Sequence, residues 1–336
     1  MKEVKKTRLT AAGFAGVFAL AMFASITSGA VGATYISFDV PDGISTEPRS
    51  INDHGDVTGT YFPSAGGFTS GFIRASDGTF TTFVVNSSDT GPTSINRAGE
   101  VVGSWEDRWG IHGFLRKPSG EIVLIVFPGL DDRDLNYENQ LRINDSGKIG
   151  GQYATRGFIR EPNGLFIAYR VNGSYTAPYG MNSAGTVTGY FLELPHNDFV
   201  GFVRAVDGTV TTFRVSGTEE TRPFGINDSG TITGWYRNGD MASGFVRAAD
   251  GSIEAFDPIG SVQTNPVGIN RRGEIAGAWF DGSQFHSFLR SAKGKITSFD
   301  PPGAKRSTAA GINDKGEIVG DYLDSQGDSH GFIRVP

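Results

Sequence analysis

The residues best suited to chemistry lie in an acidic stretch at 129–140. Oxygen-bearing side chains alternate along it, at Asp132, Asp134, Asn136 and Glu138. Because Ca²⁺ prefers several hard oxygen ligands, this alternation is compatible with a calcium site. The stretch has no glycine of the kind that bends a calcium loop sharply, so a solvated acidic loop is the alternative interpretation.

The same carboxylates could serve a carbohydrate-active enzyme, either a glycoside hydrolase or a polysaccharide lyase. Glycoside hydrolysis needs two carboxyl groups about 5 to 10 Å apart across a cleft, and Asp132, Asp134 and Glu138 offer such pairs. The His-Glu-x-x-His motif, the phosphate-binding loop and the dinucleotide fingerprint do not occur. The sequence therefore assigns no catalytic residue, and an enzyme is the alternative to a binding protein.

Aromatic side chains gather in segments whose length and composition vary along the chain. Exposed rings on a rigid surface suit sugar stacking or protein docking. The candidate ligand-binding residues are Trp109, Tyr137, Tyr175, Tyr179, Phe199 and Phe285. The five histidines show no zinc spacing, and the absence of Cys excludes a disulfide scaffold and a cysteine-ligated metal.

These residues are carried by a repeat. The tetrad Gly-Phe-apolar-Arg recurs at spacings of 42 to 44 residues, with Ser287 in place of Gly in the sixth copy. Its arginines are Arg74, Arg116, Arg160, Arg204, Arg247, Arg290 and Arg334. Each repeat also has a Gly-x-aromatic element and an apolar-Asn pair followed by a turn glycine. The asparagines of that pair are Asn52, Asn96, Asn144, Asn182, Asn227, Asn270 and Asn313.

Each repeat parses into four short strands separated by turn residues, and the chain has 48 Gly and no sustained helical period after residue 33. Units of this length with four strands are typical of β-propeller blades. The sequence therefore predicts an all-β, seven-bladed β-propeller as a single domain at 34–336. Residues 35–40 match the fourth-strand segments, and the last repeat lacks one, so we expect the N-terminal strand to close the ring.

The N-terminus has the pattern of a secretory signal peptide at 1–33. Lys2, Lys5, Lys6 and Arg8 precede 16 uncharged residues from Ala11 to Ile26, and small residues follow. A membrane anchor is the competing interpretation, but this stretch is shorter than a bilayer span. Cleavage after Ala33 would change the formal net charge from −6 to −9. We therefore expect an exported protein, periplasmic or extracellular, that inserts in no membrane and binds no nucleic acid.

In three repeats a histidine precedes the tetrad, as in His112-Gly113-Phe114, His286-Ser287-Phe288 and His330-Gly331-Phe332. Together with the Gly-Ile-Asn and Ile-x-Gly elements, this pattern resembles the HAF-type extracellular repeat of bacteria. The resemblance covers nearly the whole chain after residue 33. It implies an exported repeat protein, and it brings no catalytic residue with it.

Repetition separates scaffold from site, because a residue present in every repeat holds repeats together and a binding site breaks the symmetry. The repeated arginines are therefore interpreted as structural, paired with carbonyls or with carboxylates such as Asp53, Asp145, Asp228 and Asp314. The uniform tight turns should share one face, and the variable connections should share the other. We expect a monomeric, non-catalytic protein that binds an extracellular glycan or protein there, with no cofactor other than Ca²⁺; a purely structural matrix component is the remaining alternative.

Overall fold

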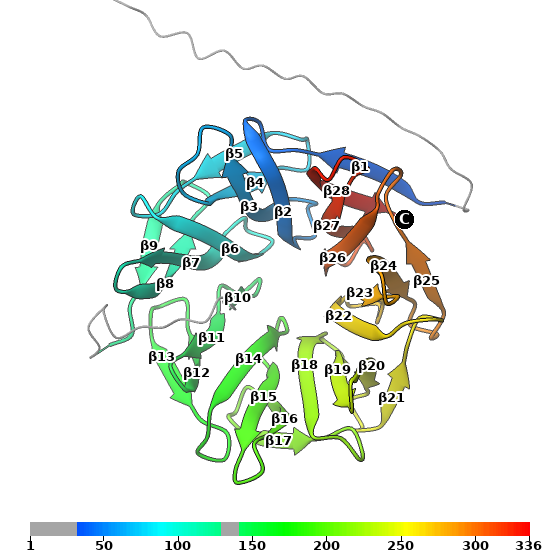
Figure 1. The fold of residues 1–336 in the computed structure, drawn as a ribbon. Coiled ribbons are helices and arrows are strands. Elements are labelled where there is room, and N and C mark those ends of the chain that lie inside the picture. The colour runs from blue at the N-terminus through cyan, green and yellow to red at the C-terminus, as the bar shows by residue number, and fades with distance from the viewer. Residues whose placement is uncertain (1–31, 129–140) are drawn as a thin grey trace, which may run out of the picture.

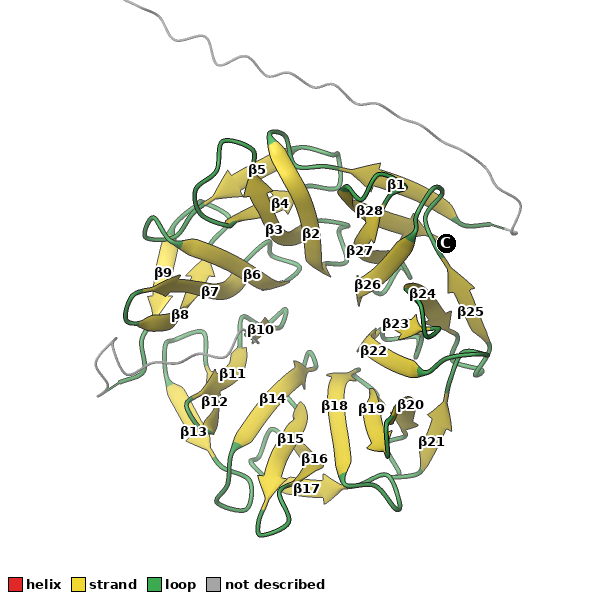
Figure 2. Ribbon diagram, viewed as in Figure 1, coloured by secondary structure: helices red, strands yellow, loops and turns green. Residues whose placement is uncertain are grey.

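A computed structural model describes residues 32–128 and 141–336 of the 336-residue chain. The described part is all-β, as predicted: Figure 2 shows strands and connections without a helix. Accordingly, these residues include no helix with the length and apolar character needed to cross a bilayer. The predicted signal peptide, apart from its last two residues, lies outside the described range.

The strands occupy four concentric positions around a central axis (Figure 1). The innermost strands are β2 (Gly43–Ile51), β6 (Asp89–Ile95), β10 (Arg142–Ile143), β14 (Thr176–Met181), β18 (Glu220–Ile226), β22 (Gln263–Ile269) and β26 (Arg306–Ile312). The second strands are β3 (Val57–Pro63), β7 (Val101–Asp107), β11 (Ile149–Tyr153), β15 (Val187–Glu193), β19 (Ile232–Asn238), β23 (Ile275–Phe280) and β27 (Ile318–Leu323).

The third position holds the tetrad strands, and the fourth forms the outer edge. The third strands are β4 (Ser70–Arg74), β8 (Gly110–Arg116), β12 (Arg156–Arg160), β16 (Asp198–Arg204), β20 (Met241–Arg247), β24 (Phe285–Arg290) and β28 (Ser329–Val335). The outer strands are β1 (Thr34–Phe38), β5 (Phe80–Phe83), β9 (Ile122–Ile125), β13 (Phe166–Tyr169), β17 (Val210–Phe213), β21 (Ile253–Phe256) and β25 (Ile296–Phe299).

Neighbouring strands within a repeat are antiparallel. Four sheets have four strands each, in the orders β2-β3-β4-β5, β6-β7-β8-β9, β10-β11-β12-β13 and β1-β28-β27-β26. A fifth sheet links β14 to β25, because single parallel bridges at Phe199↔Glu220 and Ala242↔Gln263 join three consecutive groups of four. The first strand of the chain thus pairs with the last, from Thr34↔Val335 to Phe38↔Gly331.

The repeated asparagines form a continuous series of hydrogen bonds around the axis. Each side-chain Nδ2 donates to the backbone carbonyl of the next asparagine, at 2.9 to 3.3 Å, and the series returns to its start when Asn313 donates to the carbonyl of Asn52. Each Oδ1 accepts the backbone N–H four residues later, as from Asp56 to Asn52. All seven side chains are buried. One residue type therefore caps its own turn and joins it to the next repeat.

The tetrad phenylalanines form the centre of each interface between repeats. All seven are fully buried, and each meets an aromatic ring of the preceding repeat edge-on, at centroid distances of 5.9 to 6.5 Å. Six of these rings belong to outer strands, and the seventh, Phe127, follows β9. Six of the tetrad arginines hold their guanidinium 4.8 to 5.1 Å from the same preceding ring. Arg160 instead lies over Phe166 of its own sheet. The arginines are thus interface residues.

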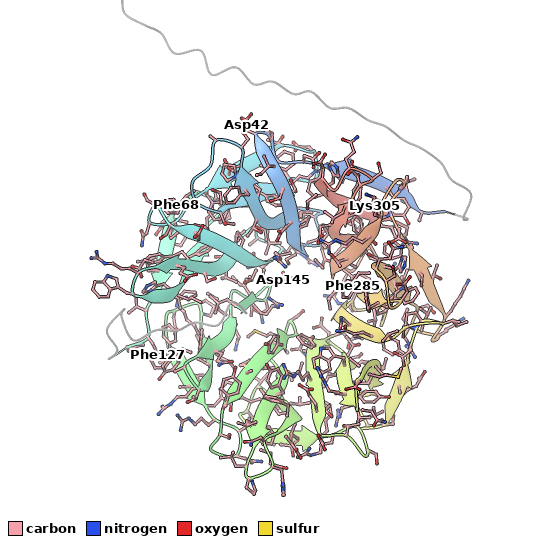
Figure 3. All side chains as sticks on the ribbon, in the orientation of Figure 1. Asp42, Phe68, Phe127, Asp145, Phe285 and Lys305 are labelled. Atoms are coloured by element: carbon pink, nitrogen blue, oxygen red, sulfur yellow. The ribbon has the colours of Figure 1, made fainter. Side chains whose placement is uncertain are left out.

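The partners expected for these arginines are correct only in part. Arg74, Arg116, Arg204 and Arg247 donate to the backbone carbonyl of the next residue, and Arg290 bonds Glu254 at 2.7 Å. The carboxylates of Asp53, Asp145, Asp228 and Asp314 instead accept from backbone N–H groups and from Arg97 and Arg271, around the axis. Asp145 lies near the centre in Figure 3. Short turns next to the asparagine ring place these carboxylates near the axis, away from the tetrad strands.

The glycine of the Gly-x-aromatic element lies close to the adjacent inner strand. A Cβ at Gly59 would overlap the carbonyl oxygen of Glu47, and a Cβ at Gly277 would also lie 2.7 Å from the ring of its tetrad phenylalanine. A Cβ at the tetrad glycine Gly71 would lie 2.7 Å from the Phe83 ring. The first glycine therefore lets two strands approach closely, and the second leaves room for the outer aromatic.

The two tight turns of a repeat lie at the same edge, as predicted. The backbone N–H of Ser76, in the β4–β5 turn, donates to Asp56 in the β2–β3 turn. The turn glycines Gly99, Gly147, Gly230 and Gly273 likewise face the second tight turn of their own repeats. At the opposite edge, the connection before β4 bonds the start of β6 through Thr69 and Asp89. The variable connections therefore meet one another away from the tight turns.

Replacing one ring asparagine should destabilise the protein strongly. Asn270→Ala removes the bond to the Asn313 carbonyl and leaves the Glu274 N–H without its side-chain acceptor. We expect the free energy of unfolding to fall by about 2 to 4 kcal/mol in urea denaturation, because two backbone groups lose partners in a buried region. Asn163→Ala, at an exposed turn, is the matched control and should cost less than about 1 kcal/mol. Equal losses would contradict a special role for the ring.

Candidate functional site

A cavity of about 950 Å³ lies between the inner strands and receives residues from β2, β3, β6, β7, β10, β18, β19, β22, β26 and β27. Its lining also includes Phe62, Thr69, Asp89 and Glu106, at the ends of strands on the variable-connection side. Arg49 and Arg142 line both this cavity and a narrower space between the inner strands. We call the larger space the axial cavity. It lies at the edge of the variable connections, where the sequence predicts ligand binding.

Local backbone irregularities aim side chains into the axial cavity. The pairing of inner and second strands shifts register next to Pro48, Pro92, Pro223 and Pro266. A β-bulge turns one residue out of the regular alternation and tolerates proline, which cannot donate to the ladder. The residues at these shifts that line the cavity are Arg49, Thr93, Phe224 and Val267. The same local geometry therefore presents a different side chain in each repeat.

Cross-strand pairs differ between repeats at this level. The variable residue inside Gly-x-aromatic, on the second strand, pairs with an inner-strand residue that comes directly before the proline or before the residue in the proline's place. These pairs are Glu47↔Thr60, Gly91↔Ser104, Arg222↔Trp235, Asn265↔Ala278 and Thr308↔Asp321. All but Arg222 and Ala278 line the axial cavity. The flanking glycine and aromatic are constant, and the residue between them is not. The repeat symmetry is thus broken at the cavity wall.

Asp321 is a partly buried carboxyl of the cavity. The Thr308 hydroxyl donates to its Oδ1 at 2.6 Å. Burial raises the pKa of Asp321, and this effect outweighs the hydrogen bond from Thr308 and the charge of Arg306. The neighbouring Glu47 carboxylate raises that pKa further, and Glu47 itself pairs with Arg49 at 2.8 Å. Two carboxyl groups of adjacent repeats therefore interact at the cavity wall.

An aromatic cluster surrounds Arg222 of β18, a strand that lies across the axis from β2, which carries Glu47 (Figure 1). Its guanidinium lies 4.7 Å from the Tyr190 ring, 4.2 Å from Phe199 and 5.1 Å from Trp235, and it pairs with Glu220 at 2.5 Å. Tyr179 stacks on Tyr190 at 5.3 Å. Two of the predicted aromatic residues, Tyr179 and Phe199, thus belong to one cluster, but they lie in β14 and β16 rather than in connections.

The other predicted aromatic residues lie apart from that cluster or at its margin. Trp109 is half-exposed at the β7–β8 hairpin with Arg108 over its ring at 4.7 Å, and Phe285 packs on Phe280 at 5.0 Å. Tyr175 immediately precedes β14, and the negative charge of its ionised hydroxyl would raise the pKa of Tyr190. Tyr137 and the calcium candidates Asp132, Asp134, Asn136 and Glu138 lie outside the described residues.

Three histidines form contacts that their sequence spacing did not predict. His112, His286 and His330 each lie against the aromatic residue of the Gly-x-aromatic element and beside a carboxylate. Burial alone would lower the pKa of His286, but the carboxylates of Asp300 and Asp281 outweigh it and raise that pKa. His330 bonds Asp39, which directly follows β1. Within the described ranges, no three His, Cys, Asp or Glu residues are placed to hold a metal ion.

Gly327 to Gly331 has the pattern Gly-x-Ser-x-Gly, which marks the nucleophile of many hydrolases. In such enzymes the serine occupies a sharp strand-to-helix turn. Here Ser329 begins β28 after a hairpin and pairs with Leu323. Ser329 and His330 are successive strand residues and point to opposite faces. The pattern therefore lacks the geometry of a nucleophile elbow.

Sequence reasoning missed Asp321, Glu47 and Trp235. A signal for them was present, because the variable position inside Gly-x-aromatic holds Thr60, Ser104, Tyr190, Trp235 and Asp321 in different repeats. Only the pairing register shows that this position and the one before the inner-strand proline face the same space.

Comparison with known proteins shows the fold alone. No protein-family model and no curated protein matches the chain. Among solved structures, an inactive variant of virginiamycin B lyase from Staphylococcus aureus is similar with 16% identity and a TM-score of 0.61, over 91% of this chain and 100% of that chain. The β-propeller domain of the Trilobed protease from Pyrococcus furiosus, which has an open Velcro topology, is similar with 8% identity and a TM-score of 0.62, over 88% and 94%.

A third similar structure is the β-propeller domain of Cps50 (Swd1) from Myceliophteria thermophila, with 9% identity and a TM-score of 0.55 over 90% of this chain and 98% of that chain. The arrangement of four-stranded sheets around an axis and these similarities identify the fold as a β-propeller.

Neutralising Asp321 should stabilise the protein at neutral pH. Because the folded-state pKa of Asp321 is raised, the folded protein holds its proton to higher pH than the unfolded chain, so stability falls as pH rises through this window. Asp321→Asn cannot ionise, and we expect a higher Tm than the parent at pH 7 and an equal Tm at pH 3. Asp240→Asn, at an exposed position, should change neither value. The quantity to compare is the Tm of Asp321→Asn minus the Tm of the parent. A difference that is no larger at pH 7 than at pH 3 would refute this account.

Proposed function

We propose that the chain is a closed β-propeller of seven blades, completed by the N-terminal strand. Two observations support this proposal: the pairing of β1 with β28 and the return of the asparagine hydrogen bonds from Asn313 to Asn52. Closure removes the unpaired sheet edge that an open ring would expose. We further propose that the protein belongs with HAF-type extracellular repeats, that residues 1–33 are a signal peptide, and that the remainder is exported.

We propose that the exported protein is a non-catalytic binding module that recognises a glycan or a protein through the edge of the variable connections. The observation that carries this proposal is the axial cavity at that edge, where repeats of otherwise constant sequence differ from one another. A rigid ring with one variable surface suits recognition, because the scaffold holds the contacts without being ordered on binding. Trp109 lies in a connection between second and third strands, and Phe285 directly follows the equivalent connection, at the same edge.

Closure predicts a large cost for a small change at the N-terminus. Phe38 is buried against Phe72 and Phe80 of the first repeat and lies beneath the Arg74 guanidinium, although its strand pairs with β28. Phe38→Ala should lower the free energy of unfolding by about 3 to 5 kcal/mol.

The matched control is Ile36→Ala on the same strand, where the side chain is 37% exposed; it should cost less than about 1.5 kcal/mol in the same urea titration. A Phe38→Ala protein as stable as the Ile36→Ala protein would argue that the N-terminal strand does not close the ring.

Binding at the variable edge can be tested on immobilised polysaccharides and extracellular proteins in calcium buffer. We expect saturable retention that Trp109→Ala weakens at least about 5-fold without changing Tm, because Trp109 is 50% exposed. Leu165→Ala, which removes an exposed apolar side chain beside a tight turn at the opposite edge, should leave retention unchanged. Equal effects of the two substitutions, or no retained ligand, would exclude recognition through this surface.

A further inference from the structure

We propose that the axial cavity is a binding site for a neutral oligosaccharide, held through its hydroxyl groups by Asp321 and Glu47 and through the apolar face of a sugar ring by Phe224 and Trp235. This inference rests on the proposed binding function and names the ligand that the function leaves open. It places the determinant of specificity inside the ring, whereas the exposed aromatic residues outside the cavity contribute contact area.

The size of the cavity favours a small or chain-shaped ligand. Its volume of about 950 Å³ is at the upper end of small-molecule sites, which span about 300 to 1,000 Å³. A folded protein partner would cover a broad, flatter surface of about 800 Å² and would anchor apolar side chains in sockets. Val267 is the largest aliphatic side chain among the lining residues, alongside alanines and prolines. The wall therefore lacks sockets for a protein's apolar anchors.

The polar groups of the wall match the hydroxyl groups of a sugar. Four carboxyls line the cavity, at Glu47, Asp89, Glu106 and Asp321, and an ionised carboxylate only accepts hydrogen bonds. Sugars present adjacent hydroxyl donors, which two oxygens of one carboxylate can accept together. Hydroxyl and amide side chains surround these carboxyls, at Ser45, Thr60, Thr93, Ser104, Asn265 and Thr308. A polyol satisfies such a wall, since each of its hydroxyls both donates and accepts.

The charge of the wall selects a neutral ligand. Four carboxyls against two guanidiniums disfavour uronates, sulfated glycans and acidic peptides. A cationic ligand is disfavoured at depth, because Arg49 and Arg142 also line the narrower space between the inner strands. The sugar would therefore lie among acceptors without bringing a charge of its own.

Asp321 supplies an independent sign of a ligand. Thr308 donates to Oδ1, and no donor among the described residues forms a hydrogen bond with Oδ2. The carboxyl is partly buried, and its pKa is raised by that burial. An acidic group with incomplete hydrogen bonding in a partly buried place costs stability, and such costs are typical of functional sites. A sugar hydroxyl at Oδ2 would replace the missing donor.

The aromatic wall is fixed before any ligand arrives. Phe224 lies parallel to Trp235 at a centroid distance of 6.4 Å, Tyr179 meets Phe224 edge-on at 4.8 Å, and Arg222 covers Trp235 at 5.1 Å. These contacts hold Phe224 and Trp235 at the cavity wall, on β18 and β19, which lie across the axis from the strand of Glu47, β2 (Figure 1). A sugar ring between the two walls could pack on an aromatic side chain while its hydroxyls face the carboxyls, with little loss of side-chain entropy.

The test is a calorimetric titration of the full-length expressed protein at pH 7 with cellohexaose, xylohexaose and mannohexaose, and with hexagalacturonate as the charged comparison. We expect saturable 1:1 binding of at least one neutral hexasaccharide and at least 10-fold weaker binding of hexagalacturonate. Asp321→Asn and Glu47→Gln should each weaken the neutral ligand at least 10-fold, since both keep the side-chain shape and remove an acceptor. Asp240→Asn, away from the cavity, should bind as the parent does.

Three results would overturn the inference: no binding of any of the three neutral hexasaccharides, preference for hexagalacturonate, or unchanged binding in both cavity variants. Measuring Tm for each variant separates loss of a ligand contact from loss of the fold. Failure here is distinguishable from failure of the proposed binding function. If a polymer or protein is retained and lost in Trp109→Ala but kept in Asp321→Asn and Glu47→Gln, the variable edge binds and the cavity is not its sugar site.

Discussion

The hydrogen bond from each repeated asparagine to the carbonyl of the next is the constraint on which the rest of the molecule depends. The same side chain accepts the N–H that closes its own turn, so the turn and the neighbouring repeat are positioned by one buried group. A buried amide with all its partners is costly to disturb. The ring of asparagines thereby fixes the distance of every inner strand from the axis, and with it the width of the axial cavity.

Farther from the axis, the interfaces rely on shape and on arginine. Each tetrad phenylalanine meets the outer aromatic of the preceding repeat edge-on, and the tetrad arginine covers that ring in six cases. Burial lowers the pKa of Arg74 and Arg116, and the Nε of Arg74 has no hydrogen-bond partner. The Arg74 guanidinium is thus held by a ring face and a carbonyl rather than by a carboxylate. Because six interfaces share the contact between arginine and ring, the scaffold leaves other positions free to differ.

Those other positions meet around the axis. Asp321 and Trp235 occupy the same second-strand position in two repeats, and Glu47 occupies the inner-strand position that pairs with it in a third. None of the three contributes to the asparagine ring or to the tetrad interfaces. Burial raises the pKa of Asp321, so its ionised form costs stability at neutral pH. The half-exposed Trp109 and the packed Phe285 lie on hairpins outside this wall. In the proposed function, the axial cavity supplies hydrogen-bond acceptors and the edge of the variable connections supplies contact area.

The sequence by itself determined the strands, their turns and the interface residues. A repeated motif such as Asn227 to Gly230 acts through local chemistry: an amide caps the turn, and a glycine takes the positive φ. It also indicated the pairing of the first strand with the last, because Phe38 matches the outer aromatics. Only the tertiary structure decided which variable residues meet. The pairing register of the inner and second strands, and the contact between the first and last repeats, bring Glu47 and Asp321 together. No local pattern encodes this contact, because the two residues lie at opposite ends of the sequence.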